Sequence, residues 1–323
     1  MPERDLYMSH SPFVLSIVVP CYNEEEVLPI TRKELLSLLH SLIEKNIISN
    51  KSFICFVDDG SKDKTWQMIE NYSTHPNIKG LKLSRNFGQQ NAMLAGLFYC
   101  AKLSEAAVTV DADLQDDITV IEDMAKKFIQ GYEIVYGVRK RRDSDTFFKR
   151  FSAEKFYKFM RYIGVDIVEN HSEFRLMSKR AIEWLEEFKE VNLFLKGIIP
   201  LIGLKSDKVY YDRKKRVAGE TKYPLKKLLG LAWDGITSFS VVPLRFITFL
   251  GIFVLIVSFI LSIWALVSKL NGQAVSGWTS MMLIVLFLGG VQMLSIGIIG
   301  EYIGKIYKET KRRPRFFVES IRG

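Results

Sequence analysis

The sequence has few cysteines and histidines, and they do not form the patterns that usually carry chemistry. Its 323 residues include three cysteines (Cys21, Cys55 and Cys100), whose spacing fits no CxxC metal site, and only 4 histidines. All three cysteines lie in or beside apolar runs, which predicts reduced thiols buried in a core within a cytosolic compartment. The spacing therefore argues against a cysteine-ligated metal site, and the odd number argues against a disulfide framework.

A signal peptide and a nucleic-acid-binding pattern are also absent from the sequence. Residues 1–12 are polar, so no signal peptide is predicted. No basic-aromatic patch or zinc-finger motif accompanies the net charge of +9. Residues 205–245 carry 10 basic and 4 acidic side chains, and residues 301–323 carry 7 and 3. Because these stretches flank long apolar segments, they suit anionic lipid headgroups and argue against a nucleic-acid partner.

Two long uncharged segments predict membrane-spanning helices. Phe246–Val267 has 22 residues and Asn271–Gly300 has 30, and neither contains a charged side chain. Each is long enough to cross a hydrocarbon core of about 30 Å. A buried hairpin in a soluble protein is the alternative, which the length and the flanking charges disfavour. Since basic residues flank both outer ends, the positive-inside rule predicts a multi-pass protein of the cell membrane whose large domain is cytoplasmic.

Short apolar runs alternate with helical patterns over the first 140 residues. Strands are predicted at Phe13–Val19, Phe53–Val57, Ile78–Leu83, Ala106–Val110 and Ile134–Tyr136, and helices at Glu24–Lys45, Lys64–Tyr72, Gln89–Ala101 and Ile118–Gln130. This alternation predicts an α/β fold with a mostly parallel, Rossmann-like sheet covered by helices on both faces. Ligands of such sheets bind at the carboxyl ends of the strands.

Two amphipathic stretches, at residues 144–163 and 221–240, have two interpretations each. Both alternate large apolar residues with lysines. An ordinary helix packed on the sheet explains the first stretch as well as an interfacial helix whose lysines reach toward water does. The second stretch lies just before an uncharged segment, which favours a helix at the membrane surface.

An Asp-x-Asp-x-Gln cluster follows the fourth predicted strand. Asp111 and Asp113 are carboxylates one residue apart, and Gln115 adds an amide oxygen on the same turn. Such hard oxygen ligands suit Mg²⁺ or Mn²⁺, which shares its remaining coordination positions with water and phosphate oxygens. A lone Asp-x-Asp is common in surface loops, so the prediction depends on the apolar strand before it and the Leu-Gln within it.

Polar motifs also follow the first three predicted strands, at Pro20–Glu24, Asp58–Ser61 and Ser84–Gly88. Each has a structural explanation as a turn, the first with Asn23 as the N-cap of a helix. Each also has a functional explanation: backbone N–H groups for a nucleotide, a carboxylate for a base or ribose, and a cation near a diphosphate. The presence of a polar motif at four strand ends favours the functional explanation.

These motifs resemble those of the polyisoprenyl-phosphate glycosyltransferases of family 2, which have a GT-A fold. That group includes dolichol-phosphate mannose synthases and bacterial undecaprenyl-phosphate glucosyl- and N-acetylglucosaminyltransferases. The matching stretches span almost the whole chain: Ser16–Glu25, Val57–Ser61, Leu83–Gly96, Asp111–Gln115, Glu173–Met177, Gly219–Tyr223, Asp234–Arg245 and Gly300–Arg315. The resemblance implies a cytosolic GT-A domain over residues 1–204, a last strand and juxtamembrane amphipathic helix over 205–244, two transmembrane helices over 245–300 and a basic cytosolic tail over 301–323.

The resemblance also implies roles for individual residues. The implied nucleotide-binding residues are Pro20, Tyr22, Asn23, Glu24, Asp58, Arg85 and Asp111. The implied metal ligands are Asp111, Asp113 and Gln115, and the implied catalytic residues are Asp113, Glu173 and Arg175. Contacts to the acceptor phosphate, or to the diphosphate, are implied for Arg139, Arg213 and Lys222.

The chain departs from the family pattern at two places. Family members often continue Asp-Leu-Gln with Pro-Pro or His-Pro, whereas this chain has Asp116-Asp117, which implies a less rigid loop after the metal ligands. Glu173 stands where Asp is common, and its longer side chain changes the geometry that a carboxylate would have there.

The resemblance implies an inverting, metal-dependent transfer of a hexose from a nucleotide sugar to a polyprenyl phosphate such as undecaprenyl phosphate. UDP-glucose and UDP-N-acetylglucosamine are the leading donors. The glycines of the second uncharged segment are equally compatible with helix packing within one hairpin and with a homo-oligomer. One alternative is a processive polysaccharide synthase, which predicts a Gln-x-x-Arg-Trp motif that the sequence lacks. The other is a non-catalytic membrane scaffold or flippase partner, against which the intact Asp111, Asp113 and Gln115 argue.

Overall fold

The computed structural model describes residues 11–140, 171–190, 195–212, 242–271 and 277–323. The chain divides into two compact units. The first holds the described residues within 1–158, 166–222 and 314–323, and the second holds those within 223–313. The predicted amphipathic helices at 144–163 and 221–240 lie outside the described residues, as do Arg213 and Lys222.

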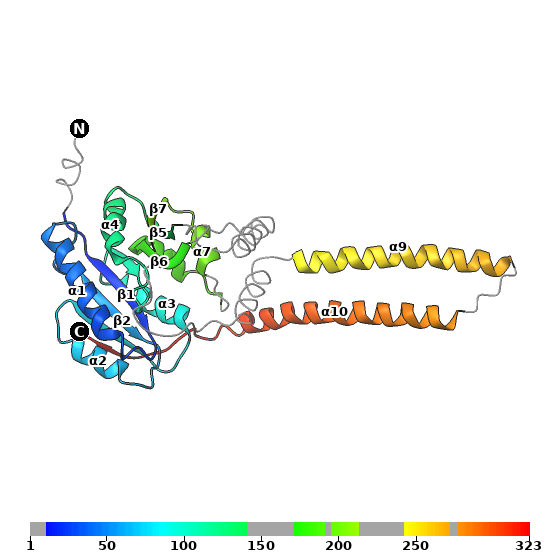
Figure 1. Ribbon diagram of the computed structural model, residues 1–323, viewed down its shortest axis with the longest axis horizontal. Coiled ribbons are helices and arrows are strands. Elements are labelled where there is room, and N and C mark those ends of the chain that lie inside the picture. The colour runs from blue at the N-terminus through cyan, green and yellow to red at the C-terminus, as the bar shows by residue number, and fades with distance from the viewer. Residues whose placement is uncertain (1–10, 141–170, 191–194, 213–241, 272–276) are drawn as a thin grey trace. The chain divides into compact units, whose positions relative to one another are not determined.

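The first unit is built on a sheet whose strands β1, β2, β5, β6 and β7 are labelled in Figure 1. The sheet has eight strands in the order β7-β5-β6-β4-β1-β2-β3-β8. The strands are β1 (Leu15–Cys21), β2 (Phe53–Asp58), β3 (Ile78–Leu83), β4 (Ala106–Thr109), β5 (Ile134–Arg139), β6 (His171–Ser178), β7 (Ser206–Tyr211) and β8 (Val318–Arg322). β4, β1, β2 and β3 pair in parallel, as do β5 and β7. β6 and β8 run antiparallel to their neighbours. The prediction of a mostly parallel α/β sheet is therefore confirmed.

Helices bury the centre of this sheet. They are α1 (Leu28–Glu44), α2 (Thr65–Tyr72), α3 (Gln89–Cys100), α4 (Ile121–Ile129), α6 (Lys179–Glu186) and α7 (Leu195–Leu201), with a 3₁₀ turn, η2 (Ile118–Val120). Every residue of β1, β2 and β4 is buried, as expected for parallel strands covered on both faces. Helix α3 approaches β1 so closely that a Cβ on Gly96 would lie 2.4 Å from Cγ1 of Val18.

The predicted start of the first helix was wrong by four residues. The helix was expected from Glu24, but α1 begins at Leu28 with Val27 as its N-cap. Asn23 has a φ of 54°, which a helix does not tolerate, and the backbone N–H groups of Val27 and Leu28 both bond to the carbonyl of Glu24. The residues between β1 and α1 therefore form a loop and not the first turn of the helix.

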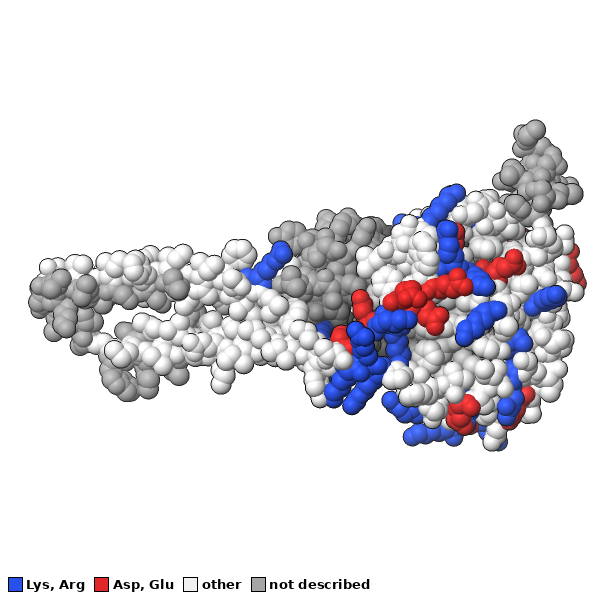
Figure 2. All heavy atoms as spheres, turned by 180° about the vertical axis from the view of Figure 1, so that it is seen from behind, with Lys and Arg blue, Asp and Glu red and all other residues white. Residues whose placement is uncertain are grey.

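The second unit contains two long apolar helices, α9 (Val242–Leu270) and α10 (Trp278–Thr310), which contact each other (Figure 1). Large apolar side chains along both are exposed, for example Phe249 at 71% and Met293 at 73%. On the face shown in Figure 2, these helices carry little colour along their length, whereas acidic and basic side chains are frequent on the first unit. Both helices are long and apolar enough to cross a membrane.

A further strand of the sheet comes from after the second apolar helix. β8 pairs antiparallel with β3, with Leu81 opposite Ile321 and Leu83 opposite Val318. From the sequence, these residues are predicted only as part of a basic tail, so the strand is an unpredicted element. Five residues with mixed charge and no clear alternation give little signal on their own, and their pairing depends on the edge that β3 offers.

Candidate active site

The four polar motifs gather at one edge of the sheet because the strands before them are parallel. Asn23 connects the first two motifs. Its backbone N–H donates to Oγ of Ser61 at 3.0 Å, and its Oδ1 accepts from the N–H of Lys62 at 2.9 Å. Asparagine adopts the left-handed conformation seen here more readily than most residues. Asn23 therefore joins two loops, and it is not the N-cap of α1 that its structural explanation required.

The other residues of the first motif differ in accessibility. Pro20 is buried within β1, opposite Val57. Tyr22 and Glu24 are partly exposed, and the backbone N–H of Glu24 donates to Oγ1 of Thr65 at 2.9 Å. Tyr22 and Glu24 therefore have side-chain surface that a ligand can reach, whereas the ring of Pro20 is enclosed by the fold.

Asp58, the last residue of β2, is a buried carboxylate with unused hydrogen-bonding capacity. Its Oδ1 accepts from the N–H of Ser61 at 3.2 Å, while its Oδ2 has no hydrogen-bond partner among the described residues. Burial raises the pKa of Asp58, and the hydrogen bonds from Ser61 partly oppose this rise. A buried acceptor without a partner costs free energy. An N–H or O–H group of a ligand would satisfy it, as predicted for a base or ribose.

Asp59 ties the second motif to the third. Its Oδ1 accepts from the N–H of Phe87 at 2.7 Å and its Oδ2 from the N–H of Gly88 at 2.9 Å. The two loops approach so closely that a Cβ on Gly60 would lie 2.5 Å from the carbonyl carbon of Arg85. From the sequence, the motif that contains Asp59 is predicted as a turn or as a carboxylate site for a base or ribose, and no contact with the third motif is predicted. The reach of Asp59 to the next loop depends on the register of β2 and β3, which the motif itself does not show.

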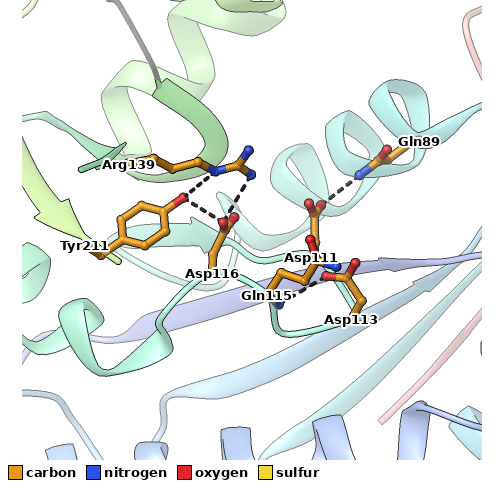
Figure 3. Close-up of polar contacts among 7 residues, drawn as sticks. All are labelled: Gln89, Asp111, Asp113, Gln115, Asp116, Arg139 and Tyr211. Carbon is orange, nitrogen blue, oxygen red and sulfur yellow. Dashed lines mark hydrogen bonds and ion pairs between the residues drawn. The ribbon is translucent and has the colours of Figure 1, made fainter. Parts of the chain in front are cut away.

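The third motif contributes the cation Arg85, and the residue that follows the motif, Gln89, contributes a side-chain amide. Arg85 is exposed, and its guanidinium carbon lies 4.1 Å from the ring centroid of Phe87. Gln89, the first residue of α3, donates from Nε2 to Oδ1 of Asp111 at 2.7 Å (Figure 3). Gln89 lies within a stretch that matches the family, but the sequence analysis assigned it no role.

Asp111, Asp113 and Gln115 lie close together on one tight turn beyond β4 (Figure 3). The N–H of Leu114 donates to the carbonyl of Asp111 at 3.2 Å, and the N–H of Gln115 donates to Oδ1 of Asp113 at 3.2 Å. Leu114 has a φ of 47°, a strained conformation for leucine. Strain of this kind concentrates at functional sites, where the surrounding contacts hold it.

Negative charges crowd around Asp111. Burial, followed by the charges of Asp116, Asp113 and Glu173, raises the pKa of Asp111 to about 7, and Arg139 opposes the rise. A divalent cation bound by these oxygens would relieve the repulsion, so the residues fit Mg²⁺ or Mn²⁺. Among the described residues, no three His, Cys, Asp or Glu side chains are grouped as a complete metal site.

A second network holds the loop just after the metal-binding residues (Figure 3). Oδ1 of Asp116 accepts from the hydroxyl of Tyr211 at 2.7 Å and pairs with Nη2 of Arg139 at 3.1 Å, and Nε of Arg139 donates to the Tyr211 oxygen at 3.2 Å. Burial disfavours the charge on Arg139, but Asp116 and Tyr211 outweigh it and raise the pKa of Arg139. The Asp116-Asp117 departure thus anchors this loop, since Asp117 also caps η2.

Glu173 and Arg175 form an ion pair on β6. Arg175 is only 1% exposed, and its Nη1 has no hydrogen-bond partner among the described residues. Thr109 at the end of β4 donates from its hydroxyl to the carbonyl of Glu173, which fixes this part of β6 beside the metal loop. The structure therefore places the two predicted catalytic residues of β6 next to β4, with Arg175 enclosed by the core.

Lys196 is a cation near this site that the sequence analysis missed. It lies on the first turn of α7, and burial lowers the pKa of its ammonium. The charges that act on it belong to Glu173, Arg175, Arg139 and Asp111, so it shares their neighbourhood. No motif surrounds Lys196 in the sequence, and only the fold shows its place. The other two predicted acceptor-phosphate residues, at positions 213 and 222, lie outside the described residues.

Comparison with known families decides what this arrangement belongs to. The profile of glycosyl transferase family 2 matches residues 16–185, which include all four motifs and Glu173 and Arg175. The chain belongs to glycosyltransferase family 2. A second profile, the GtrB C-terminal hairpin, matches residues 242–306, which cover α9 and most of α10. The predicted resemblance to this family is therefore confirmed for the sheet-bearing unit and for the apolar helices.

Relatives of this family 2 glycosyltransferase match it over nearly their full length. An uncharacterized glycosyltransferase, YkoT, of Bacillus subtilis is 51% identical over 97% of this chain and 93% of its own. The bactoprenol glucosyl transferase of Shigella phage SfX is 42% identical over 95% and 99%. Among solved structures, glucosyl-3-phosphoglycerate synthase from Mycobacterium tuberculosis, in complex with Mn²⁺, UDP-glucose and phosphoglyceric acid, aligns over 73% of this chain and 82% of its own, with 14% identity and a TM-score of 0.44.

Proposed function

We propose that this family 2 glycosyltransferase moves a hexose from a nucleotide sugar to a polyprenyl phosphate such as undecaprenyl phosphate, with inversion at the anomeric carbon. The observation that carries the proposal is the convergence of the strand-end loops on Asp111, Asp113 and Gln115 in a chain that also has two exposed apolar helices. The first feature suits a nucleotide diphosphate with a metal, and the second suits an acceptor that resides in a membrane.

Asp111, Asp113 and Gln115 would hold the metal, and Asp111 would also contact the ribose-diphosphate. When bound, Mg²⁺ or Mn²⁺ supplies charge stabilisation for the diphosphate leaving group. Burial and then the neighbouring carboxylates raise the pKa of Asp111, and a bound cation would favour its charged form, which supports this assignment. Asp58, with its unpartnered Oδ2, would accept a hydrogen bond from the base or ribose.

The acceptor phosphate would lie on the side of β5, β6 and α7. Arg139 and Lys196 are near the metal loop there, and the sequence adds Arg213 and Lys222. A lipid monophosphate has a second pKa of about 6, so at pH 7 it is largely a dianion that attacks without a general base. One phosphate oxygen would form a bond to the anomeric carbon as the bond to the diphosphate oxygen breaks. From an α-linked donor this displacement gives a β-linked product.

The donor and the topology are finer points of the same proposal. UDP-glucose is the first donor to test, because relatives of this chain are named bactoprenol glucosyl transferases, and UDP-N-acetylglucosamine is the second. The basic flanks of both apolar helices support a multi-pass arrangement in the cell membrane with the sheet-bearing unit in the cytoplasm.

The test is a transfer assay with the full-length protein in detergent or liposomes. Purified protein is incubated with Mg²⁺ or Mn²⁺, undecaprenyl phosphate and radiolabelled nucleotide sugars, and label is counted in the organic phase. Asp113→Ala is expected to reduce transfer by about 100-fold or more, because it removes a metal ligand. Asp117→Asn is the matched control, since it removes a carboxylate four residues away that caps η2, and it is expected to retain transfer.

Two results would contradict the proposal. Folded wild-type protein that transfers no sugar from any donor would favour the non-catalytic scaffold or flippase partner. Label that accumulates in polymer and not in a lipid-linked monosaccharide would favour a processive synthase.

A further inference from the structure

The chain segment Pro314–Gly323 lies along the first unit, although it follows the second apolar helix in the sequence. We call it the return segment. Its strand β8 completes one edge of the sheet by pairing with β3. Ion pairs between Lys82 and Glu319 at 2.9 Å and between Arg322 and Glu70 at 2.7 Å flank the pairing. Both pairs are exposed, so they add little to what the backbone pairing provides.

The first part of the return segment contacts the loop that follows β3, Ser84–Gln89. The backbone N–H of Ser84 donates to the carbonyl of Phe317 at 3.0 Å. The rings of Phe317 and Phe87 lie with centroids 6.4 Å apart, within the range of favourable aromatic pairs. The ring of Phe316 lies 6.4 Å from that of Phe98 on α3, the helix into which this loop leads. The return segment therefore contacts the loop at its start and at its middle, and contacts the helix that follows.

The same loop carries groups that face the proposed donor. Arg85 is exposed on it, and Gln89 at its end donates to Asp111. The loop is also held by the hydrogen bonds from Phe87 and Gly88 to Asp59. Both Asp59 and the return segment therefore hold the loop, and its position sets where Arg85 and Gln89 stand relative to the metal-binding turn.

We propose that Phe316 and Phe317 are positioning residues for the donor: they hold the loop Ser84–Gln89 in the place from which Arg85 and Gln89 meet the diphosphate and Asp111. The inference deepens the proposed function and rests on it for its kinetic readout. Phe317 acts through the loop and Phe316 through α3, the helix that follows it, so neither phenylalanine contacts the reacting atoms. The consequence is that the catalytic unit is incomplete without a segment encoded beyond the apolar helices.

The experiment compares Phe317→Ala and the double variant Phe316→Ala/Phe317→Ala with Glu319→Gln, all in the full-length protein. Glu319→Gln is the matched control, because it removes the ion pair to Lys82 from the same segment without touching the loop. Phe317→Tyr keeps the ring and serves as the conservative variant. Thermal unfolding of each variant checks that the fold is retained.

Two measurements are made. Hydrogen–deuterium exchange followed by mass spectrometry reports on peptides that cover 84–89 and, separately, β3. Steady-state kinetics give KM for the nucleotide sugar and KM for undecaprenyl phosphate. We expect Phe317→Ala to speed exchange in 84–89 and to raise the donor KM roughly tenfold, because misplacing a positioning group by a fraction of an ångström has effects of this order. The acceptor KM is expected to change less than about twofold, because the contacts that Phe317 makes with Ser84 and Phe87 are on the donor loop.

The outcomes separate this inference from the proposed function. Unchanged exchange in 84–89 in both alanine variants would overturn the inference, and so would an equal effect of Glu319→Gln or a failure of Phe317→Tyr to restore the donor KM. If the wild-type protein transfers no sugar, the proposed function fails. The inference is then decided by exchange and by the affinity for UDP with Mn²⁺, measured by calorimetry, which Phe317→Ala is expected to lower.

Discussion

The two halves of the sheet hold their charged groups in different ways. In the half formed by β4, β1, β2 and β3, the carboxylates of Asp58, Asp59 and Asp111 lie at or beyond strand ends, and Asp58 and Asp59 accept hydrogen bonds from backbone N–H groups. In the half formed by β6, β5 and β7, Arg139 and Arg175 lie on the strands and pair with acidic side chains. Loops can adjust around a ligand, whereas a side chain on a paired strand is fixed in advance. The comparison therefore predicts that the proposed donor side depends on contacts between loops, whereas the proposed acceptor side is fixed by strand pairing.

The largest expected effect concerns the half formed by β6, β5 and β7, which we call the strand half. It tests whether the ion pair of this half stabilises the fold as well as serving the site. Arg175→Met leaves Glu173 without its partner beside the core, and we expect it to destabilise the fold by about 3–5 kcal/mol. The double variant Glu173→Gln/Arg175→Met is expected to recover a large part of that stability without recovering transfer. Thermal unfolding in detergent measures the first effect and the lipid-linked transfer assay the second. Recovery of transfer by the double variant would show that this pair serves the fold alone.

A smaller effect concerns the half formed by β4, β1, β2 and β3, which we call the loop half, and it is measured as the pH dependence of stability. In the folded protein Asp111 holds its proton up to about pH 7, whereas in the unfolded chain it loses the proton near 3.8. Between these values the folded state binds more protons, so stability falls as pH rises from about 4 to 7 and the full penalty is present at pH 8. Without divalent cations, Asp111→Asn is therefore expected to be more stable than wild type at pH 8, by up to about 4 kcal/mol.

The check for Asp111→Asn is thermal unfolding at pH 8 and at pH 4.5 with a chelator present. The variant is expected to be more stable than wild type at pH 8, and this difference in stability is expected to be mostly absent at pH 4.5. Added Mn²⁺ is expected to stabilise wild type more than the variant. A gain of equal size at both pH values would show that the carboxylate crowding is not its cause.

The smallest effect tests the close contact between the second and third motifs of the loop half. Gly60 and Gly131 both have positive φ, but a Cβ on Gly60 would clash with the backbone of Arg85, whereas a Cβ on Gly131 would have nothing within 4 Å. We expect Gly60→Ala to destabilise the protein by about 1–3 kcal/mol more than Gly131→Ala. Gly60→Ala is also expected to raise the donor KM. Equal unfolding temperatures for the two variants would mean that the loops of Gly60 and Arg85 can move apart without a loss of stability.

Most of the loop half was predictable from the sequence, because its residues follow apolar strands in short motifs. The alternation of strands and helices predicted the parallel sheet, and parallel strands bring Asn23, Asp58 and Asp111 to one edge. Glu24–Val27 was predicted as helix because its side chains are compatible with one. The left-handed turn at Asn23 decided otherwise, and asparagine alone does not specify that conformation.

The strand half was less predictable, because its contacts join residues far apart in the sequence. Tyr211 meets Asp116 only because β7 pairs with β5 in one particular register. Lys196 has no surrounding motif, and its place depends on how α7 packs. The resemblance to family 2 supplied Glu173 and Arg175, but their ion pair and the burial of Arg175 came from the structure.

The pairing of β8 with β3 has a consequence for how the protein is made. Synthesis proceeds from the N-terminus, so β3 leaves the ribosome long before β8, and both apolar helices are produced in between. Throughout that interval the edge of β3 presents unpaired N–H and C=O groups, which are a template for aggregation. Closure of the sheet therefore waits until both apolar helices have been translated. A nascent chain stalled within α10 is expected to have all the residues of the metal-binding turn and yet an open sheet.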